Sequence, residues 1–176
     1  MLETPEETAQ LQALLDDSFA SAGGHLTSII GPERRLSATD LVRYLVGVRH
    51  LVVATVTASG EPRTSGADGL FVHGRWWFTS SSSSVKARHL EARPACSATH
   101  LIGDTVGVFA HGRARVVRGA SVEARSLAPI WREHYESTPE EWVDRPEDAR
   151  YFELVASRLF SYCHDRDGFE AMVARA

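Results

Sequence analysis

The sequence predicts a small antiparallel Greek-key barrel of six strands with flanking helices, a mainly β fold, and three observations lead to this class. Six segments are rich in β-branched and aromatic residues, and most of them are joined by tight turns. One short helical segment separates the third and fourth strands, and another precedes the sixth. Long helices do not alternate with the strands, so a doubly wound parallel sheet is a poor alternative.

Two helices are expected before the first strand. Apolar residues recur near helical spacing over 6–20, and a pair of glycines ends this run. The segment 25–36 is rich in turn residues around a Gly-Pro pair. Ser37 and Asp40 have the spacing of a capping box, which predicts a second helix that runs to about Gly47.

The strands and the remaining helices follow in order along the chain. The sixth strand is expected to contain an irregularity near Ser157 and Arg158. Strands are predicted over 50–58, 63–72, 75–79, 95–102, 105–118 and 151–163. Helical segments are predicted over 85–93, before Pro94, and over 120–135, 139–142 and 168–175.

The chain of 176 residues fits a single domain over 1–176, with N-terminal helices in 1–47 and a barrel core in about 48–163. A formal net charge of −4 gives no electrostatic footprint for nucleic acid, so no nucleic-acid partner is expected. No apolar run has the length of a membrane-spanning helix, and the N-terminus is acidic where a signal peptide would be basic. We therefore expect a cytoplasmic protein without a membrane partner.

Cysteine and histidine residues give little sign of chemistry. Cys96 and Cys163 lie in apolar strand-like segments without CxxC spacing, so we expect buried free thiols. The eight histidines show no HExxH or H-x-x-x-H pairing, so no metal site is expected. His100 and His111 could face each other across strands four and five, where ordinary cross-strand packing is the favoured interpretation. No catalytic side chain is identified.

A run of five serines follows the third strand and opens into a helix that carries the chain's only lysine, Lys86. Serine hydroxyls and backbone N–H groups at a helix N-terminus, with an ammonium group one turn in, predict a phosphate site. A flexible loop, in which Ser84 caps the next helix and Lys86 is solvated, explains the same residues. The run alone leaves both interpretations open.

The second strand is small and polar over 64–69, where a core strand would be bulky. Glycine inside a strand commonly marks a bulge or the close approach of another group, and a flat ring could lie over Gly66. A twisted edge strand is an equally good explanation. The hairpin between strands two and three is expected to deliver these small residues beside Thr79 and Ser80.

The order and spacing of several segments match one known family. They are a strand over 51–57, the turn at 59–62, the segment 76–80, and the segments 84–90 and 93–97. In this pattern the chain from about 41 to 162 resembles the pyridoxamine 5'-phosphate oxidase-like flavin-binding split-barrel family.

This resemblance implies a split barrel that forms a homodimer and binds FMN at the subunit interface, with the phosphate on the loop and helix after the third strand. It also implies a set of cofactor-binding residues. Ser65, Gly66 and Ala67 match the strand along the ring, Thr79 and Ser80 match residues near the ring and ribityl chain, and Ser84, Lys86 and, more weakly, Arg88 match phosphate contacts. Some branches of the family use the deazaflavin coenzyme F(420), and their phosphate loop resembles the one around Lys86. FMN is the first expectation and F(420) the alternative.

Two departures from the family pattern argue against true pyridoxamine phosphate oxidase activity. In many relatives the residue before the lysine is basic, whereas here it is Val85. The vitamin B6 oxidase also carries cationic residues on its second strand, which are replaced here by Ser65 and Leu70.

Three functions therefore compete. The first is an oxidoreductase that passes a hydride through FMN or a deazaflavin to or from a small organic substrate. The second is a flavin- or haem-binding protein without turnover, and the third is a purely structural dimer. Trp131, Tyr135 and Trp142 lie outside the strands and would suit a dimer interface, although packing of helices against the barrel explains them as well.

Overall fold

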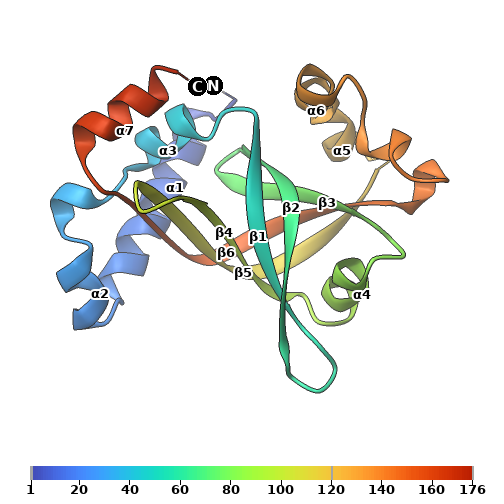
Figure 1. The fold of residues 1–176 in the computed structure, drawn as a ribbon, viewed down its shortest axis with the longest axis horizontal. Helices are drawn as coiled ribbons and strands as arrows, with labels where there is room; N and C mark the ends of the chain where they lie inside the picture. Colours follow the sequence, from blue (N-terminus) through green and yellow to red (C-terminus); the bar gives the residue numbers. More distant parts are fainter. Residues whose placement is uncertain (1, 120, 176) are drawn as a thin grey trace.

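The computed structural model describes residues 2–119 and 121–175 of the chain. Its centre is a closed barrel of antiparallel strands in the order β1-β2-β3-β6-β5-β4 (Figure 1). The strands are β1 (Val48–Val56), β2 (Pro62–Val72), β3 (Arg75–Ser81), β4 (Ala95–Ile102), β5 (Val106–Arg118) and β6 (Ala149–Cys163). The predicted six-stranded antiparallel barrel with flanking helices is confirmed.

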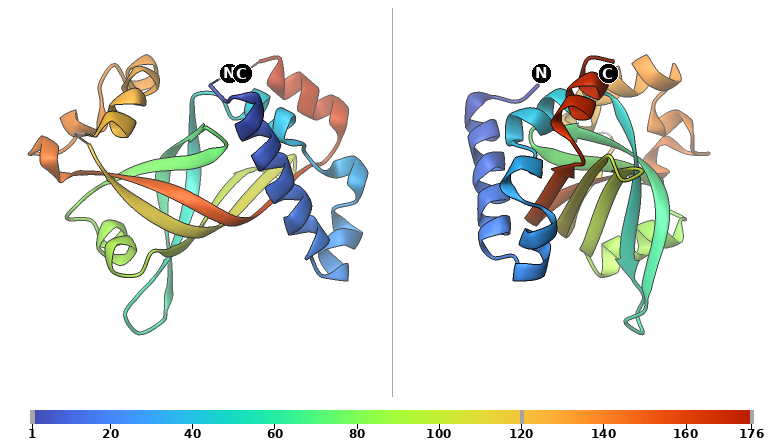
Figure 2. Two further views of the ribbon diagram at one scale, coloured as in Figure 1. Left: turned by 180° about the vertical axis from the view of Figure 1, so that it is seen from behind. Right: turned by 60° about the vertical axis from the view of Figure 1, so that its left-hand side comes forward.

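The helices surround the barrel in separate groups. Figure 1 and Figure 2 show α1, α2, α3 and α7 on one side of the barrel and α5 and α6 on the other, while α4 lies beside β1 and β3. The helices are α1 (Pro5–Ala20), α2 (Gly24–Ile29), α3 (Ala38–Tyr44), α4 (Val85–Ala92), α5 (Val122–Ser126), α6 (Ala128–Tyr135) and α7 (Arg166–Val173). Short 3-10 turns occur at Pro32–Arg34, Pro139–Glu141 and Pro146–Asp148. None of the described helices is long and apolar enough to cross a membrane.

Helix α3 begins at the capping box that the sequence predicts. The Ser37 hydroxyl accepts a hydrogen bond from the Asp40 amide at 3.1 Å, and the Asp40 carboxylate accepts one from the Ser37 amide at 2.8 Å. The helix ends at Tyr44, earlier than the predicted Gly47. The Arg49 side chain, at the start of β1, donates to the Tyr44 carbonyl at 2.7 Å and so satisfies one of the free carbonyls at this helix end.

Two segments differ from the sequence-based expectation. The stretch 25–36, expected to be turns, contains α2 and a 3-10 turn, although no residue of either element is buried. The helical region expected over 120–135 is divided into α5 and α6 at Leu127, with Pro129 in the first turn of α6. Its expected start at Ala120 lies outside the described residues.

Neighbouring tryptophans show how the strands build two apolar clusters. Trp76 and Trp77 are both buried, but Trp76 packs in the barrel interior and Trp77 packs beneath α5 and α6. Successive residues of a strand point to opposite faces, so one strand supplies both clusters. Trp131 of α6 is completely buried in the outer cluster. It is therefore a packing residue within the chain, and the expectation that it suits a dimer interface is wrong.

Strand β6 contains the predicted irregularity. His111 of β5 pairs with Arg158, whereas the next residue, Gly112, pairs with Ala156. Ser157 is thus the extra residue of a β-bulge and has no partner in the ladder between β5 and β6.

Strand β2 changes neighbours along its length. It pairs with β1 from Pro62 to Leu70, but with β3 only from Gly69 to Val72. The segment Pro62–Asp68 therefore has one backbone edge without a strand neighbour among the described residues, and the β1–β2 hairpin extends beyond the barrel (Figure 1).

The expected placement of the small residues of β2 beside Thr79 and Ser80 is therefore wrong. Thr79 and Ser80 pair instead with Tyr151 and Arg150 of β6. Strand β3 pairs with both β2 and β6 over Trp76–Phe78, and from Thr79 to Ser81 β6 is its only partner among the described strands.

Candidate functional site

The serine run forms the connection between β3 and α4. Ser84 is the N-cap of α4, because its hydroxyl accepts a hydrogen bond from the Ala87 amide at 3.0 Å. The hydroxyls of Ser80 and Ser84 lie 2.8 Å apart, so the end of β3 is hydrogen-bonded to the start of the helix. In the described residues the amides of Val85 and Lys86 find no acceptor. The loop thus has the local capping that one interpretation expects and the free donors that the other requires.

Lys86 extends from α4 to the unpaired edge of β2. Its ammonium nitrogen donates to the Gly66 carbonyl oxygen at 2.7 Å, and the residue is half-buried. Burial lowers the pKa of Lys86, and the negative charge of Asp68 acts in the opposite direction. Lys86 is therefore not the freely solvated side chain that the flexible-loop interpretation expects.

The other cationic residue predicted at this site, Arg88, has a different role. Its guanidinium donates to the Ser83 carbonyl at 2.7 Å and so braces the serine loop. His89 of α4 is hydrogen-bonded to Thr55 of β1, with 3.0 Å between imidazole Nδ1 and the hydroxyl. These contacts fix α4 against the barrel, so the free amides at its first turn keep one orientation.

Ser65, Gly66 and Ala67 lie in regular extended strand opposite Val53, Val52 and Leu51 of β1. Gly66 does not have positive φ, and a Cβ added to it would meet no atom within 4 Å. The glycine is thus required neither by a bulge nor by packing within the chain. The backbone around Gly66 is exposed at the edge of a strand, as one interpretation of the sequence expects. It also forms an open surface that a flat group could cover, as the other interpretation expects.

The structure brings together part of the predicted set of residues. Lys86 contacts Gly66, and Ser84 contacts Ser80. Thr79 is half-buried on β3 opposite Tyr151, and no hydrogen bond joins its side chain to the other predicted residues within the described part of the chain.

A polar cluster beside Gly66 was missed by the sequence analysis. The imidazole of His50 donates to the Asp68 carboxylate, with 2.9 Å between Nδ1 and Oδ1, and the two residues are direct partners of β1 and β2. Tyr135 of α6 lies near the same carboxylate, and burial together with the charge and hydrogen bonding of Asp68 raises the pKa of Tyr135 to about 12. An acidic residue within the small segment of β2 was the one available signal, since His50 and Tyr135 reach it only through strand register and helix packing.

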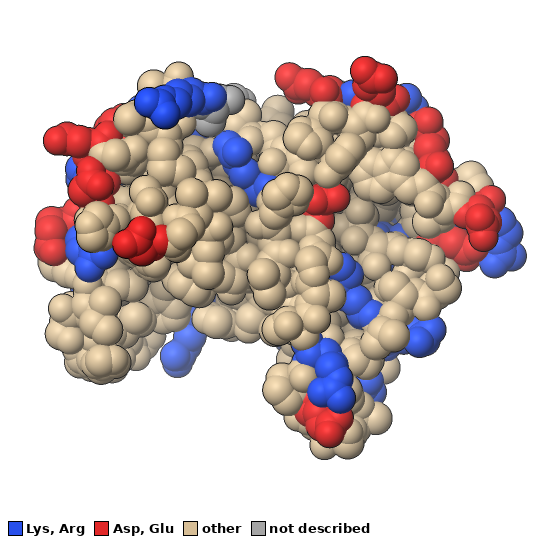
Figure 3. All heavy atoms as spheres, in the orientation of Figure 1, with Lys and Arg blue, Asp and Glu red and all other residues tan. Residues whose placement is uncertain are grey.

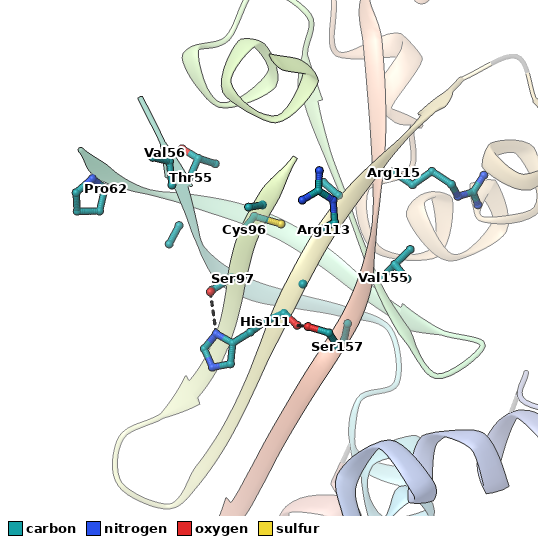
Figure 4. A pocket seen from close by; sticks show the side chains of 15 residues that line it. Thr55, Val56, Pro62, Cys96, Ser97, His111, Arg113, Arg115, Val155 and Ser157 are labelled. Carbon is teal, nitrogen blue, oxygen red and sulfur yellow. Dashed lines mark hydrogen bonds between the residues drawn. The ribbon is translucent and has the colours of Figure 1, made fainter. Parts of the chain in front are cut away.

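A groove of about 870 Å³ lies on the outer surface of β1, β4, β5 and β6 (Figure 4). Much of its wall is apolar, including Val56, Pro62 and Val155, and Val155 is 45% exposed. Arg115 also lines the groove, and its guanidinium donates to the buried carboxylate of Glu153, which accepts a second hydrogen bond from Arg75 at 2.6 Å.

His111 lies at the edge of this groove and pairs with Ser97, with 2.8 Å between Nδ1 and the hydroxyl (Figure 4). His100 instead points into the barrel, where it donates from Nδ1 to the His50 carbonyl at 3.0 Å and accepts from the Tyr44 hydroxyl at 3.2 Å. The possible pairing of His100 with His111 is therefore wrong.

Both cysteines are buried free thiols, as predicted. Burial raises the pKa of Cys96 to about 11, so this thiol stays protonated at neutral pH and is a poor nucleophile.

The charges on the face of Figure 3 are unevenly distributed. Several cationic side chains lie where α4 and the β1–β2 hairpin are, whereas acidic side chains lie over α5, α6 and the loops after them and also on the opposite side, over the terminal helices. Lys86 and Arg88 lie on α4, and Arg63 lies on the β1–β2 hairpin, where it pairs with Glu61 at 2.8 Å. A positive field around the first turn of α4 favours an anionic ligand there.

Comparison with known proteins gives a family and a set of structural relatives. A family model described as pyridoxamine 5'-phosphate oxidase matches residues 39–163. No curated protein sequence matches the chain at a significant level.

Several solved structures share the fold. A conserved hypothetical protein of Mycobacterium tuberculosis, Rv2991, is 24% identical with a TM-score of 0.63, covering 78% of this chain and 91% of that chain. HutZ, the heme storage protein from Vibrio cholerae, is 20% identical with a TM-score of 0.58, covering 70% of this chain and 93% of that one. A FAD-binding protein from Mesorhizobium loti is 16% identical with a TM-score of 0.56, covering 73% and 95%.

Proposed function

Because the chain belongs to the pyridoxamine 5'-phosphate oxidase family, we propose that it is an FMN-dependent oxidoreductase that transfers a hydride to or from a small organic substrate. The observation that carries this proposal is the position of Lys86 between the first turn of α4 and the open strand surface at Gly66. Phosphate donors and a surface for a flat ring therefore adjoin, and FMN has both a phosphate and a flat ring.

The residues present fit this cofactor. The Ser80 and Ser84 hydroxyls, the free amides of Val85 and Lys86, and the Lys86 ammonium are suitable donors for a phosphate. Ser65, Gly66 and Ala67 would lie along the ring, and Arg88 would act indirectly by bracing the loop. When bound, the flavin supplies the hydride chemistry, while the chain binds and orients it.

The substrate is proposed to differ from pyridoxamine phosphate. A second phosphate would need its own cationic residues, and the two positions on β2 where the vitamin B6 oxidase carries them are neutral. Leu70 is completely buried in the cluster beneath α5 and α6, and Ser65 is exposed and uncharged. A neutral or weakly charged small molecule suits this surface better.

A homodimer with a shared cofactor site is part of the proposal. The edge of β2 over Pro62–Asp68 has no strand neighbour in the described chain, and such edges are normally covered. The adjoining groove has apolar walls, and Val52, Val116 and Val155 are exposed on the same strands. A second copy of the chain placed there would cover both features at once.

The visible absorption spectrum of the purified protein, followed by titration with FMN and riboflavin, tests the cofactor. Oxidised-flavin bands and tighter binding of FMN than of riboflavin would support the proposal, because only FMN carries the phosphate. A single deazaflavin-type band would replace FMN with coenzyme F(420). A Soret band would favour haem binding without turnover, which the shared fold of the heme storage protein HutZ makes the competing role.

A further inference from the structure

A second cavity, of about 490 Å³, lies between the end of α3, the start of β1 and α6. It shares no lining residue with the proposed flavin site. Most of its wall is apolar and consists of Val42, Leu45, Val48, Phe71, Val72 and Ile130. The volume falls within the range of about 300–1,000 Å³ that is typical of small-molecule sites.

Among the described residues, Arg49 is the one lysine or arginine that lines this cavity. Its Nη2 donates to the Tyr44 carbonyl at 2.7 Å, and its guanidinium carbon lies 5.3 Å from the centre of the Tyr44 ring. Its Nε is buried and has no acceptor in the described part of the chain. No described carboxylate forms an ion pair with Arg49 either.

A partly buried guanidinium without a counter-charge is unfavourable, and an anion that reaches it would compensate the charge and supply the missing acceptors. Two carboxylates, Glu3 and Glu133, also line the cavity. Glu133 is exposed, and Glu3 accepts a hydrogen bond from the Leu2 amide at 3.1 Å. Their negative charges would repel a ligand that carries a second anionic group.

We infer that this cavity binds a small organic monoanion, such as a medium-chain carboxylate, with its head group on Arg49 and its apolar body against the valine, leucine and phenylalanine side chains. A cationic group that lacks a carboxylate partner, beside a mostly apolar wall, is suited to an amphipathic anion. This site goes beyond the proposed flavin chemistry, because its ligand contacts none of the residues proposed for FMN.

Calorimetric titration of the 176-residue chain with sodium octanoate, and with octanol as the uncharged analogue, tests this inference. We expect one saturable octanoate site per chain, with weaker binding of octanol. Arg49→Met keeps much of the side-chain volume and removes the charge, so it should weaken octanoate at least tenfold and leave octanol unchanged. The matched control is Arg43→Met, because Arg43 is exposed on α3, pairs with Glu170 at 2.9 Å and does not line the cavity.

Arg49→Met also removes the hydrogen bond to Tyr44, so thermal melts accompany each titration. If that variant does not fold, Ile130→Trp provides the test of the binding site. The tryptophan side chain would fill the cavity from α6 and leave Arg49 in place. Ile130→Trp should abolish binding of octanoate and octanol alike.

Absence of saturable octanoate binding, an equal loss in Arg43→Met, or full octanoate affinity in folded Arg49→Met or Ile130→Trp would overturn the inference. Octanoate binding that persists in the wild type at saturating FMN separates this site from the flavin site, and competition between the two would contradict that separation.

Discussion

The ammonium nitrogen of Lys86 lies 2.7 Å from the carbonyl oxygen of Gly66, and this hydrogen bond spans the opening between helix α4 and the unpaired edge of strand β2. The side chain thereby places a positive charge beside the first turn of α4 and beside an open strand surface.

Lys86→Ala should weaken FMN binding by about tenfold to hundredfold, because loss of a charge-assisted hydrogen bond to phosphate costs about 1.5–3 kcal/mol. Riboflavin affinity should not change, since riboflavin has no phosphate. The melting temperature should hardly move, because the half-buried ammonium is desolvated and makes one hydrogen bond. Fluorescence titration with each flavin measures the effect, and Arg43→Ala is the control. An equal loss for both flavins would remove Lys86 from the phosphate site.

The preference for FMN over riboflavin should decline at alkaline pH. Burial holds the pKa of Lys86 below its ordinary value of about 10.4, so the ammonium loses its charge at a lower pH than a solvated lysine does. The phosphate is already fully ionised above pH about 7, because its second pKa is about 6. As pH rises through the pKa of Lys86, the FMN-to-riboflavin affinity ratio should fall to that of Lys86→Ala. Lys86→Arg stays charged, so its ratio should remain flat, and a parallel decline in that variant would contradict the prediction.

Gly66→Val should lower flavin affinity by about tenfold or more without loss of stability. The position is extended, and an added Cβ would meet nothing in the chain, so valine fits the strand and places bulk only where the ring is proposed to lie. Gly69→Val is the contrasting control, because its Cβ would overlap the Leu51 side chain and lie 3.3 Å from the Trp77 carbonyl. The control should lose stability with or without flavin. Full flavin affinity in folded Gly66→Val would leave the ring surface without support.

Val155→Asp should convert the proposed dimer to a monomer and reduce FMN affinity with it. Val155 is 45% exposed on the groove, and burial of an unpaired carboxylate in an interface costs several kcal/mol. Val122→Asp is the matched control, since Val122 is 78% exposed on α5, away from the groove lining. Analytical ultracentrifugation at concentrations well above micromolar gives the mass of each variant. A wild type that sediments as a monomer with FMN present would refute the shared site.

The features that the sequence predicts correctly are those that local physics determines. The capping box at Ser37 and Asp40 involves residues three apart, and turn residues enclose the fourth strand so closely that its predicted bounds, 95–102, match β4. The bulge at Ser157 follows from the phase of the apolar pattern in β6. Each of these signals lies within a few residues of the structure it specifies.

The features that the sequence analysis missed depend on the partner of each strand. Nothing near Thr79 indicates that β3 leaves β2 after Phe78 and continues along β6. The cluster of His50, Asp68 and Tyr135 forms only when β1 pairs with β2 and α6 packs nearby. Trp131, which was considered for a dimer interface, is buried because α6 covers the outer face of the barrel. Such contacts join distant parts of the chain and leave no periodic pattern.

The bulge in β6 has a consequence for how the length of this chain can vary. Ala156 and Leu159 both face the barrel interior, and they are three positions apart because Ser157 lies between the paired residues Ala156 and Arg158. Deletion of Ser157 would restore strict alternation and leave every pairing partner of β5 unchanged. Deletion of a single residue between Tyr151 and Ala156 would instead exchange inward-facing and outward-facing side chains from the deleted position to the bulge. Loss of one residue here, at the edge of the proposed dimer groove, is therefore compatible with an unchanged barrel.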